Sequence, residues 1–151
     1  MSGVAVRTAL PSDVAVLVRL LAGGSLVEGA EDPADLEPYR AALEEIAAAP
    51  DGEVLVAEVD GEVVGVCQLI VFRHLQHRGG RCAEIESVHV RSDRRSLGIG
   101  GELVESAVAR AAAAGCYRVQ LTSNQVRDRA HRFYERHGFV RSHEGYKRPL
   151  G

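Results

Sequence analysis

Hydrophobic and polar residues alternate along this chain with two different periods, and each period predicts one type of secondary structure. In four segments the apolar residues recur every three or four positions, which is typical of one buried helix face. These helical segments are residues 14–21, 38–49, 103–111 and 130–137. Strand-like runs lie at residues 4–8, 53–59, 62–72, 84–90 and 118–122, with one or two further strands expected within 139–147. This order predicts an α/β domain with a mixed, mostly antiparallel sheet flanked by helices.

Local signals locate the connections between these elements. Pro11 to Asp13 predict the start of the first helix, and Asp60-Gly61 predicts a two-residue hairpin turn. Residues 22–37 are rich in Gly, Pro and acidic residues, so they predict a loop. Residues 73–82 predict a second, polar and basic loop.

Length and composition are consistent with one folded domain over residues 1–151. The chain has 151 residues, of which 46% are hydrophobic and 26% are charged, which excludes a disordered or low-complexity protein. The net charge of -3 hides an asymmetry, because residues 1–72 carry a net charge of -10 and residues 73–151 carry +7. The basic half suits an anionic ligand and the acidic half a cationic one.

Targeting signals and cysteine patterns favour a cytoplasmic protein. The N-terminal sequence lacks the basic run and long apolar core of a signal peptide, and no apolar stretch is long enough to cross a membrane. Cys67, Cys82 and Cys116 are odd in number and lack the CxxC spacing, which argues against a disulfide framework or a zinc site. No metal cofactor is expected.

A glycine-rich loop joins the strand that ends at Val90 to the helix that follows it. The loop carries Gly98, Gly100 and Gly101, and the amide groups at the start of the helix can face an anion. Arg95 adds a fixed positive charge. The loop matches neither the P-loop nor the G-x-G-x-x-G pattern, so the residues alone leave two alternatives, an anion site and a tight turn.

Two motifs in this chain resemble the signatures of the GNAT superfamily of N-acetyltransferases. Residues 95–100 (RSLGIG) are similar to the Q/R-x-x-G-x-G/A loop of that family, although Leu97 stands where many members have a basic or polar residue. Residues 121–124 (LTSN) and 130–139 (AHRFYERHGF) resemble its second signature. The resemblance implies the GNAT fold, in which the sheet is splayed between its fourth and fifth strands.

The resemblance also implies acetyl-CoA as the cosubstrate. Its pyrophosphate would lie on the 95–100 loop, and its pantetheine arm would lie between the strands that end at Val90 and Thr122. Asn124 is either a partner of that arm or a local turn cap. The cofactor-binding residues expected on this basis are Val88, His89, Val90, Arg95, Ser96, Leu97, Gly98, Ile99, Gly100, Gly101, Asn124 and Tyr134.

Acetylation of an amine needs a base, an oxyanion donor and an acid for the leaving thiolate. Glu84 and Glu86 lie two apart on one strand and therefore share a face, which makes either a candidate base if that face lines the cleft. We favour Glu86, the nearer to the expected thioester position. Tyr134 matches the family tyrosine that protonates the thiolate, and the amide of Val88 is the expected oxyanion donor. His89 is expected on the opposite face of the strand, with Ser87, unless a bulge shifts the register.

The expected acceptor is a small primary amine. It would approach between the acidic 22–37 loop and the basic 73–82 loop, either of which could instead be plain solvated surface. The second signature resembles small-molecule members such as aminoalkylphosphonate and amino-sugar N-acetyltransferases. The alternatives are a peptide or lysine acetyltransferase and a non-catalytic acetyl-CoA sensor. A sequence pI of 6.1 and few aromatic residues disfavour nucleic-acid binding, and the resemblance leaves a homodimer open.

Overall fold

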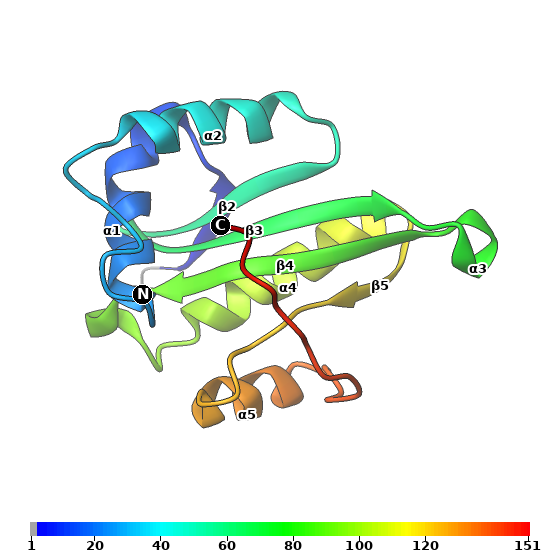
Figure 1. Cartoon of the computed structure of the whole chain (residues 1–151). Coiled ribbons are helices and arrows are strands. Elements are labelled where there is room, and N and C mark those ends of the chain that lie inside the picture. Colours follow the sequence, from blue (N-terminus) through cyan, green and yellow to red (C-terminus); the bar gives the residue numbers. More distant parts are fainter. Residues whose placement is uncertain (1–2) are drawn as a thin grey trace.

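A five-stranded sheet forms the centre of this computed structural model, which describes residues 3–151 (Figure 1). The spatial order follows the chain order, β1 (Ala5–Thr8), β2 (Gly52–Val59), β3 (Glu62–Arg73), β4 (Arg81–Val90) and β5 (Cys116–Gln120). The first four strands pair antiparallel, and β5 pairs parallel with β4. The prediction of a mixed, mostly antiparallel sheet flanked by helices is therefore confirmed.

The helices cover both faces of the sheet. The helices α1 (Val14–Gly24) and α2 (Glu37–Ala48) lie against one face, and α4 (Ile99–Ala113) lies against the other. The short α5 (Asp128–Arg136) follows β5 and stands at the edge of the sheet (Figure 1). Within the described residues, no helix is both long and apolar enough to cross a membrane.

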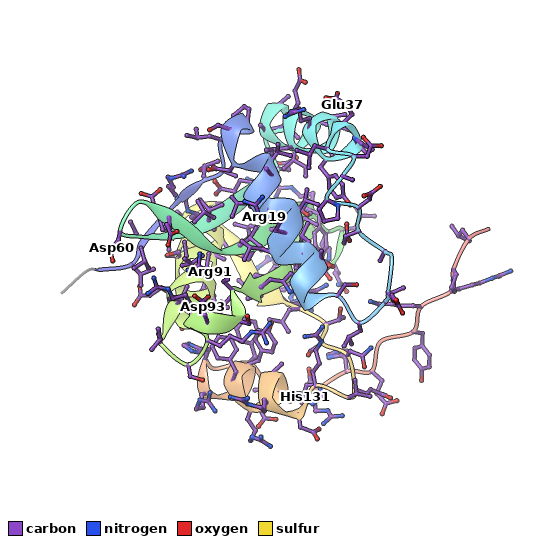
Figure 2. The ribbon with its side chains drawn as sticks, turned by 90° about the vertical axis from the view of Figure 1, so that its left-hand side faces the viewer. Arg19, Glu37, Asp60, Arg91, Asp93 and His131 are labelled. Carbon is purple, nitrogen blue, oxygen red and sulfur yellow. The ribbon has the colours of Figure 1, made fainter. Side chains whose placement is uncertain are left out.

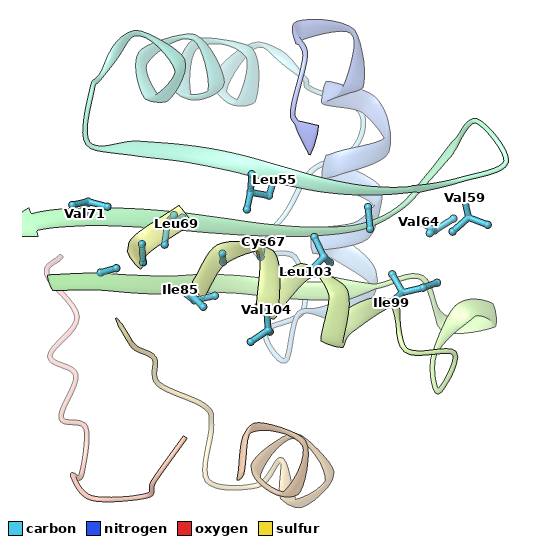
Figure 3. Packing of buried hydrophobic residues seen from close by; sticks show 14 residues of the cluster. Leu55, Val59, Val64, Cys67, Leu69, Val71, Ile85, Ile99, Leu103 and Val104 are labelled. Carbon is cyan, nitrogen blue, oxygen red and sulfur yellow. The ribbon is translucent and has the colours of Figure 1, made fainter. Parts of the chain in front are cut away.

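The larger of two hydrophobic clusters lies between the sheet and α4 (Figure 3). The cluster contains Leu55, Cys67 and Ile85 from the three central strands, and Leu103 and Val104 from α4. All five are almost completely buried. Gly65 belongs to this face, because a Cβ atom built there would come within 2.9 Å of the Leu103 side chain. The glycine thus lets α4 approach the sheet closely.

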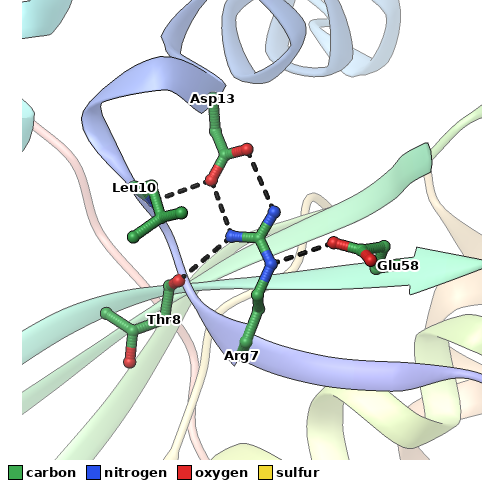
Figure 4. A network of polar contacts seen from close by, with 5 residues as sticks. All are labelled: Arg7, Thr8, Leu10, Asp13 and Glu58. Atoms are coloured by element: carbon green, nitrogen blue, oxygen red, sulfur yellow. Dashed lines mark hydrogen bonds and ion pairs between the residues drawn. The ribbon is translucent and has the colours of Figure 1, made fainter. Parts of the chain in front are cut away.

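A polar network fixes the start of α1 on β1 (Figure 4). Arg7 on β1 donates two hydrogen bonds to the carboxylate of Asp13, at 2.8 and 3.1 Å, and one to Glu58 on β2 at 2.9 Å. Asp13 also accepts a hydrogen bond from the Leu10 amide at 2.7 Å. Asp13 therefore stabilises the helix start that the sequence predicts.

Strand β4 has two irregular features, a divergence from β5 and a β-bulge. Only its first residues, from Arg81 to Glu84, pair with β5, so the two strands diverge beyond Glu84 and Gln120. A β-bulge also interrupts its pairing with β3, because Glu86 opposes Gln68 whereas His89 opposes Val66. This leaves one extra residue on β4. Ser87 lies in the bulge with a φ of 54°.

Two expectations about the connections are wrong. The expected terminal strands within 139–147 are absent, because that segment forms no regular secondary structure. The expected 73–82 loop is shorter, since β3 continues to Arg73 and β4 begins at Arg81. The turn between them contains the one-turn helix α3 (Gln76–Gly79) and lies beside the starts of β4 and β5 (Figure 1).

Candidate active site

The divergence of β4 and β5 opens a cleft between the strands and α5. The cleft has a volume of about 160 Å³. Its walls come from the end of β4, from the segment after β5, and from the start and middle of α5. The lining residues are Ile85, Ser87, Val88, His89, Thr122, Ser123, Asn124, Arg127, Ala130 and Tyr134.

The edge of β4 presents peptide groups to this cleft. The amide of Arg91 donates to Val64 O on β3 at 2.8 Å, so the peptide groups of Arg91 face β3. Successive residues of a strand turn their peptide groups to opposite edges, which directs those of Val90 and Val88 away from β3. Arg95 Nε donates to Val90 O at 3.2 Å from that side. The Val88 edge can therefore pair with an extended ligand in the cleft.

The glycine-rich loop lies where β4 ends and α4 begins. Ser96 and Gly98 both have positive φ angles, of 66° and 83°, which turn the backbone sharply into the helix. The first-turn amides of α4 have no partner within the helix and carry the positive end of its dipole. Cβ atoms on Gly100 and Gly101 would lie only 3.4 Å from Phe133 and 3.0 Å from His137, so these glycines also let α5 pack closely.

Glu84 and Glu86 share the face of β4 opposite α4, as the period of two predicts. Ala83 and Ile85 point into the core beneath α4, which directs the two carboxylates to the other side. Partial desolvation and the neighbouring carboxylate of Glu84 raise the pKa of Glu86, and the charge of Lys147 partly opposes this. A raised pKa brings a carboxylate closer to the range of a general base.

His89 lies on the same face as Glu86, which is the outcome expected only where a bulge shifts the register. The bulge at Ser87 inserts one residue and reverses the alternation, and Val88 and Val90 accordingly pack against the α4 core. A methyl group on Gly24 would overlap the imidazole of His89, so the last residue of α1 packs directly on it.

The environment of His89 favours its neutral form. Its pKa is lowered mainly by burial, and then by the charges of Arg127 and Arg95. The charge of Glu31, in the acidic connection between α1 and α2, acts on this pKa in the opposite direction.

Tyr134 and Asn124 line the opposite wall of the cleft. Burial raises the pKa of Tyr134, with Arg127 opposing, so the phenol holds its proton firmly. The ring packs edge-on to Phe133 and Phe139, with centroids 5.2 and 5.9 Å away. Asn124 Oδ1 accepts a hydrogen bond from the Val126 amide at 3.1 Å, which is the turn-cap geometry.

Arg127 is a cleft residue that sequence reasoning missed. Its guanidinium donates to Gly24 O at 2.6 Å, which ties the start of α5 to the end of α1. The two residues are separated by 103 positions, and neither lies in a recognisable motif, so no sequence signal could have paired them.

The basic turn at residues 73–82 does not bound the cleft. It lies at the start of β4, and five strand residues, or about 17 Å, separate Arg81 from Glu86. His74 instead contacts Tyr117, with Nδ1 and the phenol oxygen 2.7 Å apart. The expectation that this segment flanks the acceptor is therefore wrong, because the extended β3–β4 hairpin carries it to the far end of the sheet.

A larger pocket of about 360 Å³ lies between α2, the start of β2 and the end of α4, but its charged residues Glu53 and Arg110 are already paired at 2.9 Å. Among residues 3–151, no group of three or more His, Cys, Asp or Glu side chains is arranged to hold a metal ion.

Comparison with known proteins assigns the family. Residues 24–139 match the model of the Acetyltransferase (GNAT) family. The chain belongs to the GNAT family. Members of this family are acyltransferases. The sheet is splayed between its fourth and fifth strands, as the resemblance implied.

Two curated relatives of this GNAT protein are similar over about two thirds of the chain. The aminoalkylphosphonate N-acetyltransferase of Salmonella typhimurium is 35% identical over 101 residues, covering 67% of this chain and 65% of the relative. Glucosamine 6-phosphate N-acetyltransferase 1 of Oryza sativa subsp. japonica is 34% identical over 111 residues, covering 72% and 66%. The chain thus spans just under two thirds of each relative.

Solved structures extend the similarity to nearly the whole chain. A transcriptional regulator from Bacillus halodurans is 36% identical with a TM-score of 0.91, covering 98% of this chain and 100% of that one. A putative acetyltransferase from Agrobacterium tumefaciens is 27% identical with a TM-score of 0.87, covering 97% and 99%.

Proposed function

We propose that this protein is an N-acetyltransferase that moves an acetyl group from acetyl-CoA to a primary amine of a small anionic molecule. The observation that carries the proposal is the cleft itself, where the free edge of β4 faces Tyr134. Glu86 lies between two lining residues, Ile85 and Ser87, although its own side chain is not part of the lining. Both curated relatives are named as N-acetyltransferases of amines that carry phosphorus anions. The cytoplasmic location and a homodimer stay predictions.

The residues around the cleft fit acetyl-CoA, which supplies the acetyl group as a thioester. The first-turn amides of α4, with Arg95, suit the pyrophosphate because they combine donors with positive charge. The peptide edge from Val88 to Val90 suits the amides of the pantetheine arm. Leu97, which is 62% exposed, would contribute its backbone alone.

Three groups would carry the chemistry. Glu86 accepts a proton from the ammonium group of the acceptor, directly or through water, because only the neutral amine can attack the thioester. The Val88 amide donates to the carbonyl oxygen as negative charge develops on it. Tyr134 donates its proton to the departing thiolate, and its raised pKa ensures that the proton is present. Glu84 tunes Glu86 by repulsion and is the alternative base.

Acetyl-CoA turnover with a panel of amines tests this proposal, with free thiol release as the measurement. An aminoalkylphosphonate and glucosamine 6-phosphate are compared with the same amines lacking the anionic group. We expect Glu86→Gln to lower kcat/KM by about 100-fold or more and to abolish the acid limb of its pH profile. Tyr134→Phe is expected to lower kcat by a similar factor.

Matched controls lie far from the cleft. Glu44→Gln on α2 and Tyr117→Phe at the start of β5 make the same chemical changes, and we expect both to leave turnover intact. Wild-type turnover in both Glu86→Gln and Tyr134→Phe would refute the assigned base and acid.

A non-catalytic regulator that binds acetyl-CoA is the second candidate, because the similar Bacillus halodurans structure is described as a transcriptional regulator. The same panel separates the two. Tight CoA binding without turnover of any amine would favour the regulator.

A further inference from the structure

The amino groups of this protein are very few. Its 18 basic Lys and Arg residues include one lysine, Lys147, and 17 arginines. A guanidinium stays protonated at any physiological pH and does not act as a nucleophile, whereas a lysine amine that has lost a proton does. Apart from the N-terminus, Lys147 is therefore the only amine in the chain that an acetyl group could reach.

The segment that carries Lys147 passes beside one wall of the candidate site. After α5 the chain turns back, and Gly145 comes beside Thr122 of the cleft, where a Cβ atom would lie 3.8 Å from Thr122 Cγ2. Beyond this point the chain stands clear of the sheet, and residues 141–151 are all exposed (Figure 2). Figure 2 shows this end of the chain on the same side of the sheet as the acidic connection between α1 and α2.

Glu86 is a residue of β4, the strand across the cleft from Thr122. It occupies the face of β4 opposite α4, and the charge of Lys147 lowers its pKa, as expected for an ammonium close to the carboxylate. Residues 141–151 belong to no helix or strand, and Lys147 is exposed, so no secondary structure restrains its side chain from reaching the carboxylate.

We propose that Lys147 occupies the acceptor position of its own active site and is acetylated there when no small amine is bound. This inference rests on the proposed function. The Nζ atom loses one proton to Glu86 and attacks the thioester carbonyl of acetyl-CoA. A C–N bond forms, the C–S bond breaks, and the CoA thiolate takes a proton from Tyr134. The nitrogen loses its second proton to solvent, and the proton on Glu86 returns through water to the Tyr134 phenolate. The net products are therefore acetyl-lysine, CoA and one proton.

The tether determines how this reaction competes with a free acceptor. A short flexible connection gives Lys147 an effective concentration on the order of millimolar at the site. A free amine at a concentration well above this value displaces Lys147 from the site, whereas a free amine at a much lower concentration does not. Acetylation removes the positive charge beside Glu86 and leaves a neutral amide in its place. Lys147 thus competes with the small amine for the acceptor position, and it becomes acetylated when that amine is absent.

The test incubates the full-length protein with acetyl-CoA alone and maps acetylated peptides by mass spectrometry. We expect one acetyl group on Lys147, formed at a first-order rate that does not change when the protein is diluted tenfold. A saturating acceptor amine should suppress it, and Glu86→Gln should slow it about 100-fold or more. Lys147→Arg keeps the charge but removes the amine, so it should carry no acetyl group at that position.

The remaining outcomes overturn the inference, and two of them separate it from the proposed function. Turnover of a small amine with Lys147 unmodified would refute the inference alone, whereas neither reaction would refute both. Equal acetylation of an unfolded chain would show simple chemical modification. Acetylation confined to the N-terminus, or a rate that falls on dilution, would likewise refute an intramolecular reaction at Lys147.

Discussion

At the scale of single residues, the most consequential polar contact outside the site is the one around Asp13. Among the described residues it is the only charged side chain that is buried, with 8% of its surface exposed. It keeps its charge because Arg7 and the Leu10 amide both donate to it. The hydrogen bonds from Arg7 lower the pKa of Asp13 despite its burial.

We expect Asp13→Asn to lower the free energy of unfolding by about 2 kcal/mol at neutral pH, because Arg7 loses the closer-paired of its two charged partners and keeps only Glu58. The sign of the pH effect follows from the lowered pKa. The contribution is fully present above the ordinary value of 3.8 and is lost as pH falls through the lower folded pKa. We therefore expect the free energies of unfolding of the wild type and the variant, measured by urea denaturation from pH 7 to pH 3, to approach each other at the acid end.

Glu37→Gln is the matched control, because it breaks the exposed pair between Glu37 and Arg40. Such pairs contribute little, so we expect a change below about 0.5 kcal/mol. An Asp13→Asn effect no larger than this control would contradict the assignment of Asp13 as a structural anchor.

At the scale of elements, the bulge in β4 arranges the candidate site. It lets Glu86 and His89 share one face while Val88 and Val90 both pack into the core on the other. Its geometry requires a positive φ at Ser87, which a branched side chain strongly disfavours.

We expect Ser87→Val to lower the free energy of unfolding by about 1–3 kcal/mol and to reduce turnover, because it strains the bulge. Ser87→Gly removes the same hydroxyl but accepts the conformation, so it should keep both properties near those of the wild type. Urea denaturation and acetyl-CoA turnover measure the two effects. Equal behaviour of the two variants would mean that the bulge does not control the site.

The elements also show what sequence patterns can and cannot predict. The periods of the hydrophobic residues correctly located α4, α5 and the β2–β3 hairpin. The two-residue period of a strand correctly placed Glu84 and Glu86 on one face. The pattern could not locate the bulge, since alternation contains no information about register with β3. Residues 139–147 were wrongly expected as strands, because strand-like composition forms a strand only where a neighbour supplies hydrogen bonds.

At the scale of the molecule, charges from both halves of the chain act on His89 at the cleft. The basic half contributes Arg95 and Arg127, and the acidic half contributes Glu31, and all three charges act on His89. The sequence predicted two ligands of opposite sign from this asymmetry. The fold brings the two halves together, because Arg127 reaches across to Gly24.

The positive charge near the glycine-rich loop predicts that acetyl-CoA binding depends on salt concentration. If Arg95 and the α4 amides hold the phosphates of CoA, screening should weaken binding, and we expect the Kd of acetyl-CoA to rise about tenfold between 0.05 and 0.5 M salt. Acetyl-pantetheine has the same thioester arm without those phosphates, so its Kd should change little. Calorimetric titration of both ligands measures the difference, and Arg95→Gln should flatten the salt dependence for acetyl-CoA alone. Equal salt dependence of the two ligands would mean that the phosphates lie away from this loop.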